Sequence, residues 1–546
     1  MDFTEVIKTD VLVIGSGGAG LCAAISAKRE GADVLMVGKS RMGRANNTAI
    51  SGGAFAVATG LRSVDDTPEL HVKDTLVSGR WINRPGMVRT MADGAAEQLE
   101  NLVSCGVSFQ KIKEGKLRIV PVPGHSAPRH VIAENSFGTG FTFPLSRNAE
   151  SAGVKFLPNV FVERLCRSEQ GNIAGALILD PVKQDSILIS AKSIVLASGG
   201  GGQIYSQTNN APGTTGDGYA LAFRLGLPLI DMEFVQCYPT VLSGTSLSTK
   251  IVLYEALIFR GGARLFNSRD EDIILRHNLD DPAKMTRDAL TLAIAKEIEE
   301  GRGISGAVWL DLSSISSQKF EKFSIFVPKS QKGKTRFPVS PAVHHFMGGL
   351  LVNNQGETSI EGLYAAGEVN GGVHGANRLG GNALTETWVF GDLTGRLAAQ
   401  YSMGKKQPAI SEAFKDIESE IGSRAKKEGK FFMQDLQKEL KRLMWEKAGI
   451  LRSKEKLSAL IKDIENLKQR TAEFCPNNLK EYIKKRETEN MLIAGESTAR
   501  SALFRKESRG AHFRSDFPDE GGDEWIKNTL IKGDDLEMKV ESIENK

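Results

Sequence analysis

Two segments of the sequence combine basic or imidazole side chains with glycines, as a site for a carboxylate substrate requires. Residues 341–349 read Pro-Ala-Val-His-His-Phe-Met-Gly-Gly and contain His344, and residues 374–380 read His-Gly-Ala-Asn-Arg-Leu-Gly and contain Arg378. Fixed cations and hydrogen-bond donors bind carboxylates and polarise the bound molecule. The two segments therefore suit the binding of a carboxylate.

A third segment has the glycine spacing of a dinucleotide-binding turn. It reads Gly15-Ser16-Gly17-Gly18-Ala19-Gly20 and satisfies G-x-G-x-x-G. It follows an apolar run at 10–14, which predicts a strand, and precedes residues 20–30, which can form a helix. Gly15 permits the tight turn, Gly17 lets backbone N–H groups approach a pyrophosphate, and Gly20 allows close helix–strand packing. The alternative is an ordinary glycine-rich turn.

The acidic residue that usually binds the ribose at the end of the second strand is missing. After the apolar run at 33–37, position 38 is Gly and position 39 is Lys. The missing acid makes NAD a less favoured cofactor than FAD, because FAD can anchor its ribose elsewhere. Glu368, at the end of the strand-like residues 362–366, is a substitute anchor. Its alternative role is that of a helix-capping carboxylate.

The composition limits the class of protein. The chain has 546 residues and a formal net charge of +4, too slight to indicate a nucleic-acid partner. Glycine is enriched, with 57 residues, of which 48 lie in residues 1–402. The five cysteines are too far apart for a zinc or iron–sulfur cluster, so we predict no metal. The sequence shows neither a signal peptide nor an apolar run that could span a bilayer, which favours a cytoplasmic chain.

Several ordered motifs resemble the flavoprotein family of succinate dehydrogenase and fumarate reductase, to which L-aspartate oxidase is closely related. The resemblance covers nearly the whole chain. The matching segments are residues 11–15, 47–53, 73–75, 215–218, 231–233, 341–349, 366–368, 374–380, 444–446 and 505–512.

This resemblance implies an α/β fold with a doubly wound, Rossmann-like FAD-binding domain, an inserted α+β capping domain and a C-terminal helical domain. The expected bounds are 1–218 and 342–404 for the FAD-binding domain, 219–341 for the capping domain and 405–510 for the helical domain. Residues 511–546 are acidic and polar, and we expect a loosely ordered extension. From 405 onwards, apolar residues at helical spacing, such as Leu436, Leu440 and Leu443, support the helices.

The resemblance also implies a reaction and roles for its residues. A hydride passes between flavin N5 and one carbon of a dicarboxylate, while Arg287 moves a proton at the neighbouring carbon. Glu255 would reprotonate Arg287, and Arg260 is the nearest candidate for a second relay arginine, although the match needs a one-residue shift. Arg378 resembles the arginine that clamps a carboxylate, and His344 resembles the substrate histidine.

Arg378, His344 and Arg287 each have a simpler structural interpretation. Arg378 could form a surface salt bridge, and His344 could be a core histidine with satisfied hydrogen bonds. Arg287 could form an ion pair with Asp288 at a helix N-terminus.

Two substrate positions depart from the family pattern. Tyr238 occupies the position of a histidine that contacts a substrate carboxylate, and Tyr254 that of a substrate-binding threonine. Phenols can donate to a carboxylate but change the volume and charge of the pocket. Fumarate or succinate remains the leading substrate, with a larger unsaturated acid as an alternative. His345 stands where the family usually has Tyr, and its role is open.

We expect the flavin to be bound without a covalent link, because Asn46 lies where respiratory members carry the attaching histidine. The expected cofactor-binding residues are Gly15, Ser16, Gly17, Gly18, Ala19, Gly20, Lys39, Thr48, Ser51, Gly52, Gly53, Ala197, Gly199, Asp217, Glu368, Asn382 and Leu384.

The chain offers no cysteine cluster or haem motif that could pass electrons on from the flavin. One hypothesis is a catalytic subunit that exchanges electrons with a separate iron–sulfur subunit, with membrane association only through partners. A second is a stand-alone enzyme similar to L-aspartate oxidase. A third is a flavin-binding subunit without catalysis, which the retained Glu255, Arg287, His344 and Arg378 disfavour.

Overall fold

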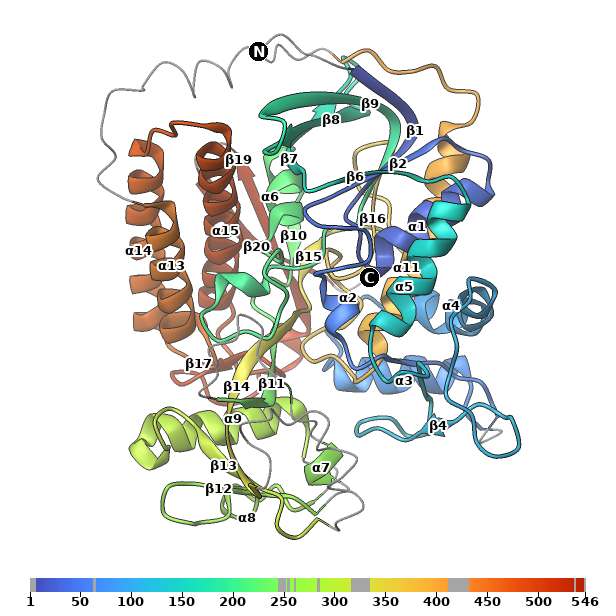
Figure 1. Ribbon diagram of the computed structural model, residues 1–546. Helices are drawn as coiled ribbons and strands as arrows, with labels where there is room; N and C mark the ends of the chain where they lie inside the picture. The colour runs from blue at the N-terminus through green and yellow to red at the C-terminus, as the bar shows by residue number, and fades with distance from the viewer. Residues whose placement is uncertain are drawn as a thin grey trace.

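Figure 1 shows the computed structural model of the chain. The structure describes residues 6–61, 65–243, 252, 256–259, 262–281, 285–315, 334–410, 432–534 and 537–544. Its three main parts are a doubly wound sheet with helices, a smaller α+β unit drawn below it, and a group of long helices beside it. The predicted fold class is confirmed in each of these parts.

The largest sheet has the strand order β6-β2-β1-β9-β8-β7, with β16 also paired to β9. Its parallel strands are β1 (Val6–Ile14), β2 (Val34–Gly38), β6 (Lys155–Pro158), β9 (Asp185–Leu196) and β16 (Leu363–Ala365). The strands β7 (Phe161–Arg167) and β8 (Ile173–Asp180) add an antiparallel edge. The end of β1 is fully apolar and buried, as expected of a strand covered on both faces.

Two helices pack closely on this sheet. They are α1 (Gly18–Arg29) and α11 (Asn382–Ser402). A Cβ added at Gly395 would lie 2.2 Å from Ala23 O, and one at Gly391 would lie 2.7 Å from Ala19 O. The two glycines therefore allow the helix backbones to touch, which fixes the start of α11 relative to the glycine-rich turn.

Shorter elements surround the sheet and lead towards the predicted site. They are α2 (Asn47–Ile50), β3 (Ala54–Ala56), α3 (Pro68–Ser78), α4 (Pro85–Ser104), β4 (Ile119–Val120), β5 (His130–Ile132), α5 (Thr139–Ser151) and α6 (Asp217–Arg224).

The inserted unit has its own sheet and its own core. The sheet order is β11 (Val235–Leu242), β14 (Arg336–Phe346), β13 (Val308–Asp311) and β12 (Arg264–Phe266), all antiparallel. The helices are α7 (Ala256–Phe259), α8 (Ile273–Arg276) and α9 (Arg287–Glu297). Leu290, Ile294 and Phe337 are fully buried among them. The long strands β11 and β14 connect this unit to the rest of the molecule (Figure 1).

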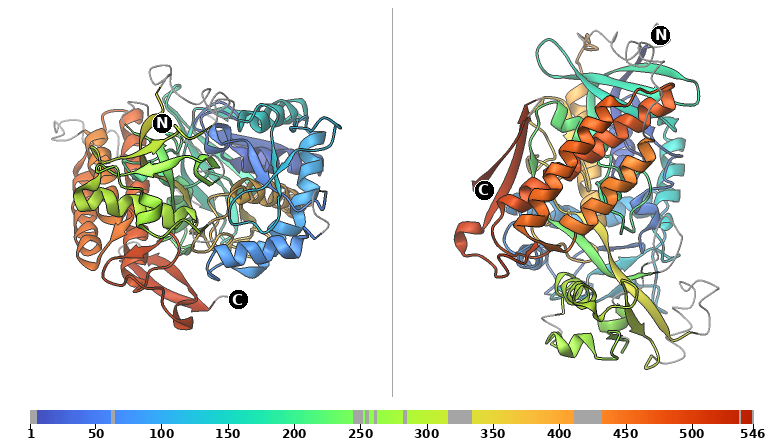
Figure 2. Two further views of the ribbon diagram at one scale, coloured as in Figure 1. Left: turned by 90° about the horizontal axis from the view of Figure 1, so that it is seen from below. Right: turned by 90° about the vertical axis from the view of Figure 1, so that its left-hand side faces the viewer.

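The predicted helical group is also present. Its members are α13 (Met433–Ala448), α14 (Lys454–Glu473) and α15 (Leu479–Phe504), which lie side by side in Figure 2. The apolar residues at helical spacing are buried, for example Leu440 and Leu457. Short strands β17 (Leu451–Arg452) and β18 (Phe513–Arg514) pair in parallel next to this group.

The expectation of a loosely ordered C-terminal extension is wrong. Strand β19 (Lys527–Asp534) pairs with β10 (Leu229–Ile230) and with β20 (Glu537–Glu544), while β15 (Gly349–Leu350) completes the sheet. Leu530 and Ile531 are buried. Most side chains of the segment are polar, so the sequence lacks the apolar alternation of a strand; its order comes from pairing with a strand about 300 residues earlier in the chain.

We predict that Ile531→Ala destabilises the protein by about 2–4 kcal/mol, because it leaves a cavity under β19. The exposed neighbour Lys532 is the control, since Lys532→Ala removes only a surface ion pair with Glu541. The measurement is chemical denaturation of both variants. Equal unfolding midpoints for the two variants would show that β19 contributes nothing to stability.

Candidate active site

The glycine-rich turn joins the end of β1 to the start of α1, as predicted. Gly15 has φ +114°, and a Cβ there would lie 2.2 Å from Ala197 O. A Cβ at Gly20 would lie 1.9 Å from Gly15 O. Gly17 differs, because its added Cβ meets only Asn46, at 3.7 Å. Gly15 and Gly20 are thus needed for packing, whereas Gly17 leaves room for a ligand.

The segment 46–53 lies against this turn. Asn46 accepts a hydrogen bond from the backbone of Ala49 at 2.9 Å and so caps α2. The hydroxyl of Thr48 accepts from Gly18 N at 3.2 Å, and the hydroxyl of Ser51 donates to Thr48 O at 2.8 Å. Gly53, which follows Gly52 in the sequence, has φ +64° and packs against the backbone of Phe137.

Glu368 is a buried carboxylate between two parts of the predicted cofactor site. It accepts from Phe346 N at 3.0 Å and from the Asn47 amide at 3.2 Å. Burial raises the pKa of Glu368 to about 7 despite these hydrogen bonds. A Cβ at Gly200 would lie 2.4 Å from its Oε1. Its hydrogen bonds come from a strand amide and a side chain, so Glu368 does not cap a helix.

Lys39 and Asp217 contact each other. The Lys39 ammonium lies 2.6 Å from Asp217 Oδ2 and 2.8 Å from Glu487 Oε1 on α15. Asp217 also accepts from the Asn490 amide at 2.8 Å. Lys39, which follows β2 where dinucleotide-binding folds usually have an acidic residue, therefore joins the end of β2 to the helical group.

At the start of α11, the amide of Asn382 is held at both ends. Its oxygen contacts His71 Nε2 at 2.9 Å, and its nitrogen donates to the Thr75 hydroxyl at 2.9 Å. Leu384 is buried one turn into the helix. The side chain of Asn382 is thus a support for the start of α11.

These residues fit an FAD. The added Cβ at Gly199, which has φ +75°, meets nothing within 4 Å, whereas that at Gly17 makes only ordinary contact with Asn46. The ends of β1 and β9 lie side by side next to them, where Ala197 N donates to Ile14 O at 2.8 Å. A dinucleotide binds at the carboxyl ends of parallel strands in such sheets.

Four predicted substrate residues meet beside this cradle. The Arg287 guanidinium lies over the ring of Tyr238, 4.9 Å from its centroid, and the rings of Tyr238 and His344 are 5.3 Å apart. Burial first, and then the positive charges of Arg378 and Arg287, hold the pKa of His344 well below its usual value. His344 Nδ1 contacts the Asn209 side chain at 3.1 Å.

The structure bears on the simpler structural interpretations of Arg378 and Arg287. Arg378 is 5% exposed, which argues against a surface salt bridge. The carboxylate of Asp288 contacts Asn377 and Arg80. Tyr254, Glu255 and Arg260 lie outside the described residues.

Two histidines that sequence reasoning missed hold the loop after Arg378. His125 Nε2 and His130 Nε2 contact Gly380 O at 2.8 and 2.7 Å. Burial lowers the pKa of His130 to about 4 and that of His125 well below its usual value, so both rings are neutral. No regular spacing in the sequence marks these residues, because they lie about 250 positions before their acceptor.

His345, whose role was open, belongs to a buried group with His374 and Glu386 that has the spacing of a metal site. However, His374 Nε2 already contacts Glu386 Oε2 at 2.8 Å. The positive charge of Arg378 also helps to lower the pKa of His345, after burial. A further cation would be repelled there, so these contacts favour a hydrogen-bonded pair over a metal centre.

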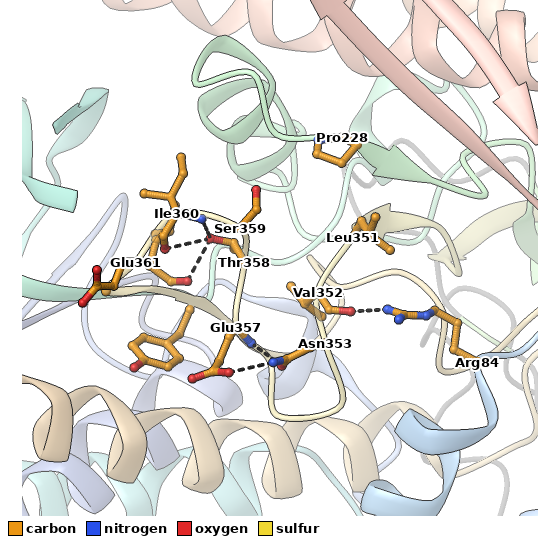
Figure 3. Close-up of a pocket in the computed structure, with 13 residues that line it drawn as sticks. Arg84, Pro228, Leu351, Val352, Asn353, Glu357, Thr358, Ser359, Ile360 and Glu361 are labelled. Atoms are coloured by element: carbon orange, nitrogen blue, oxygen red, sulfur yellow. Dashed lines mark hydrogen bonds between the residues drawn. The ribbon is translucent and has the colours of Figure 1, made fainter. Parts of the chain in front are cut away.

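The large cavity in Figure 3, about 920 Å³, lies elsewhere. It is lined by Arg84, Pro228 and residues 351–353 and 357–364, and it includes no predicted site residue. Figure 3 shows its polar groups bonded to one another: Arg84 to Val352 O, Asn353 to Glu357, and Thr358 to Ile360 O. Its side chains are thus engaged in holding their own loop.

Comparison with known proteins identifies the family. The model of the FAD binding domain matches residues 10–384, and that of the fumarate reductase flavoprotein C-terminus matches residues 437–546. The chain belongs to the succinate dehydrogenase and fumarate reductase flavoprotein family. This member is an FAD-dependent oxidoreductase, and among its described residues no helix is long and apolar enough to cross a membrane.

Several relatives match this flavoprotein along its length. A subunit of the fumarate reductase (CoM/CoB) of Methanothermobacter marburgensis is 34% identical over 97% of this chain and 98% of its own. L-aspartate oxidase of Nostoc is 31% identical over 96% and 93%. The structure of a quinol–fumarate reductase with menaquinol molecules has a TM-score of 0.89 at 27% identity, covering 99% of this chain and 98% of that one.

We predict that Gly17→Val abolishes FAD binding without unfolding the apoprotein, because the new side chain enters space that no protein atom fills. FAD content after reconstitution and the melting temperature of the apoprotein are the measurements. Ser104→Val, on the exposed end of α4, is the control and should bind FAD normally. Full flavin content in Gly17→Val would show that the cofactor does not approach this turn.

Proposed function

We propose that this chain is the flavoprotein subunit of a fumarate reductase or succinate dehydrogenase-type enzyme, acting on a C4 dicarboxylate. The observation that carries the proposal is the arrangement around His344. The Arg287 guanidinium stacks on Tyr238, whose ring lies 5.3 Å from that of His344. A Cβ at Gly380, in the loop of Arg378, would lie 3.8 Å from Arg287 Nη2. Two guanidinium groups beside a neutral imidazole suit a molecule with two carboxylates. Our division into domains at 218, 341, 404 and 510 is part of the same proposal.

In this proposal the chain binds, orients and protonates the substrate. Bound FAD would supply the hydride chemistry through its N5 atom. Arg378 binds one carboxylate, and His344 and Tyr238 donate to the substrate from the side of the inserted unit. Burial around them limits water, which strengthens each of these interactions.

Arg287 moves the proton at the carbon next to the one that exchanges the hydride. The usual pKa of an arginine is above 12, so the group can act as an acid only when it is held against the substrate and is reprotonated afterwards. We assign reprotonation to Glu255, with Arg260 as the second relay arginine. The Tyr238 ring supports the Arg287 guanidinium by a cation–π contact.

We predict that Arg287→Ala retains FAD and loses dicarboxylate turnover by at least about 100-fold, the low end of what a positioned acid contributes. The measurement is anaerobic oxidation of reduced viologen with fumarate and with bulkier unsaturated dicarboxylates. Arg269→Ala, at an exposed position of the inserted unit, is the control. Full activity of Arg287→Ala would contradict the proton-donor role, and turnover of a bulkier acid alone would make Tyr238 a specificity determinant.

We also propose that FAD is bound noncovalently and that an iron–sulfur protein, as a separate subunit, exchanges electrons with it. The Asn46 side chain is used to cap α2, and an amide does not form the bond that a histidine forms with the flavin. The M. marburgensis relative is named as a subunit, and the sequence holds no cysteine cluster of its own.

Acid denaturation should therefore release all the flavin into the supernatant. Flavin that stays with the precipitated polypeptide would contradict the noncovalent proposal.

Purification from the native host should recover an iron–sulfur protein with this chain. Recovery of the chain alone, with aspartate-dependent peroxide formation, would instead favour a stand-alone enzyme like the Nostoc L-aspartate oxidase, which is 31% identical.

A further inference from the structure

The two arginines of the substrate site come from different parts of the chain. Arg287 is the first residue of α9 in the inserted unit, and Arg378 lies in the loop before α11. Like charges that approach one pocket repel each other. Contacts between the two parts must therefore keep the arginines together.

One such contact joins the residue after Arg287 to the residue before Arg378. The amide nitrogen of Asn377 donates to Asp288 Oδ1 at 3.0 Å. The side chain of Asp288 is 9% exposed, and Asn377 is 5% exposed, so water hardly competes with this bond. A hydrogen bond to a charged group is among the stronger ones in proteins.

The orientation of the Asn377 amide is fixed from the other side. Its oxygen accepts from Gln236 Nε2 at 3.0 Å, and Gln236 Nε2 also donates to Arg378 O at 2.9 Å. Asn377 must then turn its nitrogen towards Asp288. Gln236 is buried on β11, the strand that leads into the inserted unit. The chain of bonds thus runs from β11 through the Arg378 loop to α9.

A strained loop adds an outer contact. Arg80 Nη2 lies 3.7 Å from Asp288 Oδ2. Arg80 and Trp81 have φ +55° and +63°, a backbone conformation that is strained for residues other than glycine. The loop is held by Ala376 N, which donates to Gly79 O at 2.9 Å. Because the Arg80 side chain is 40% exposed, this ion pair is the weaker part of the arrangement.

We propose that Asp288, Asn377 and Gln236 are positioning residues that lock the inserted unit onto the Arg378 loop and set the geometry between Arg287 and Arg378. This inference rests on the proposed function for its effect on turnover. None of the three residues needs to touch the substrate. Their loss should separate the two arginines, raise KM for the dicarboxylate and lower kcat, while leaving FAD bound.

The test uses a reversal of the hydrogen bond in the full-length flavoprotein. Asn377→Asp places two carboxylates against each other and should lower kcat/KM with fumarate by about 10- to 100-fold, within the range of coupling between contacting residues. Asp288→Asn combined with Asn377→Asp restores one donor and one acceptor and should recover most of the loss. The exposed variant Arg89→Ala, which breaks a surface pair with Glu69, is the control.

Amide hydrogen exchange over α9 is the second measurement and does not depend on the substrate. It should be faster in Asn377→Asp and return to the native rate in the double variant. Unchanged exchange together with unchanged kcat and KM in Asn377→Asp would overturn the proposal. If the unmodified protein reduces no dicarboxylate, the proposed function fails, and the exchange rates alone decide whether the lock exists.

Discussion

The proposed substrate site depends on holding two guanidinium cations, those of Arg287 and Arg378, near each other against their mutual repulsion. At 4 Å and an effective dielectric constant of 20, two like charges repel by about 4 kcal/mol. The nearby histidines add no positive charge, because burial and the same arginines hold the pKa of His344, His345 and His130 below their usual values. In the proposed function, a dianionic substrate would compensate both guanidinium charges at once, and the free energy of their repulsion would then favour a dicarboxylate.

The glycine richness of the Arg378 loop follows from the same constraint. A Cβ at Gly375 would lie 2.5 Å from Gly79 O, and one at Gly381 would lie 2.4 Å from His130 Nε2. At Gly380 it would come within 3.8 Å of Arg287 Nη2. The closer contact of that Cβ would be with Val122 Cγ1, at 2.9 Å. The loop therefore passes close to several other segments, which bare backbone allows. Glycine is enriched in residues 1–402, and glycines such as Gly375 and Gly381 serve contacts between protein segments.

Local patterns predicted the parts of the fold that are determined locally. The apolar run before Gly15, the strand-like residues at 362–366 and the spacing of Leu436 and Leu440 all led to the correct elements, because burial on one or both faces leaves a sequence signal. Contacts between distant segments leave no such signal. The carboxylate of Asp288 accepts from the amide of Asn377, 89 residues away, and no local pattern in the sequence marks this contact. Strand β19 was missed for the same reason, since its pairing with β10 decides its structure.

The C-terminal segment around residues 509–511 packs against the loop that carries Arg378. Ala511 N donates to Ala376 O at 2.9 Å. Gly510 has φ +54°, and a Cβ there would lie 2.3 Å from the same oxygen, so this position requires glycine. Arg509, paired with Glu507 and Glu520, donates to the backbone oxygen of Arg80. The segment therefore supports both the residues before Arg378 and the strained loop that faces Asp288. Since β19 anchors the same segment to β10, the pairing of these two strands indirectly supports the loop that carries Arg378.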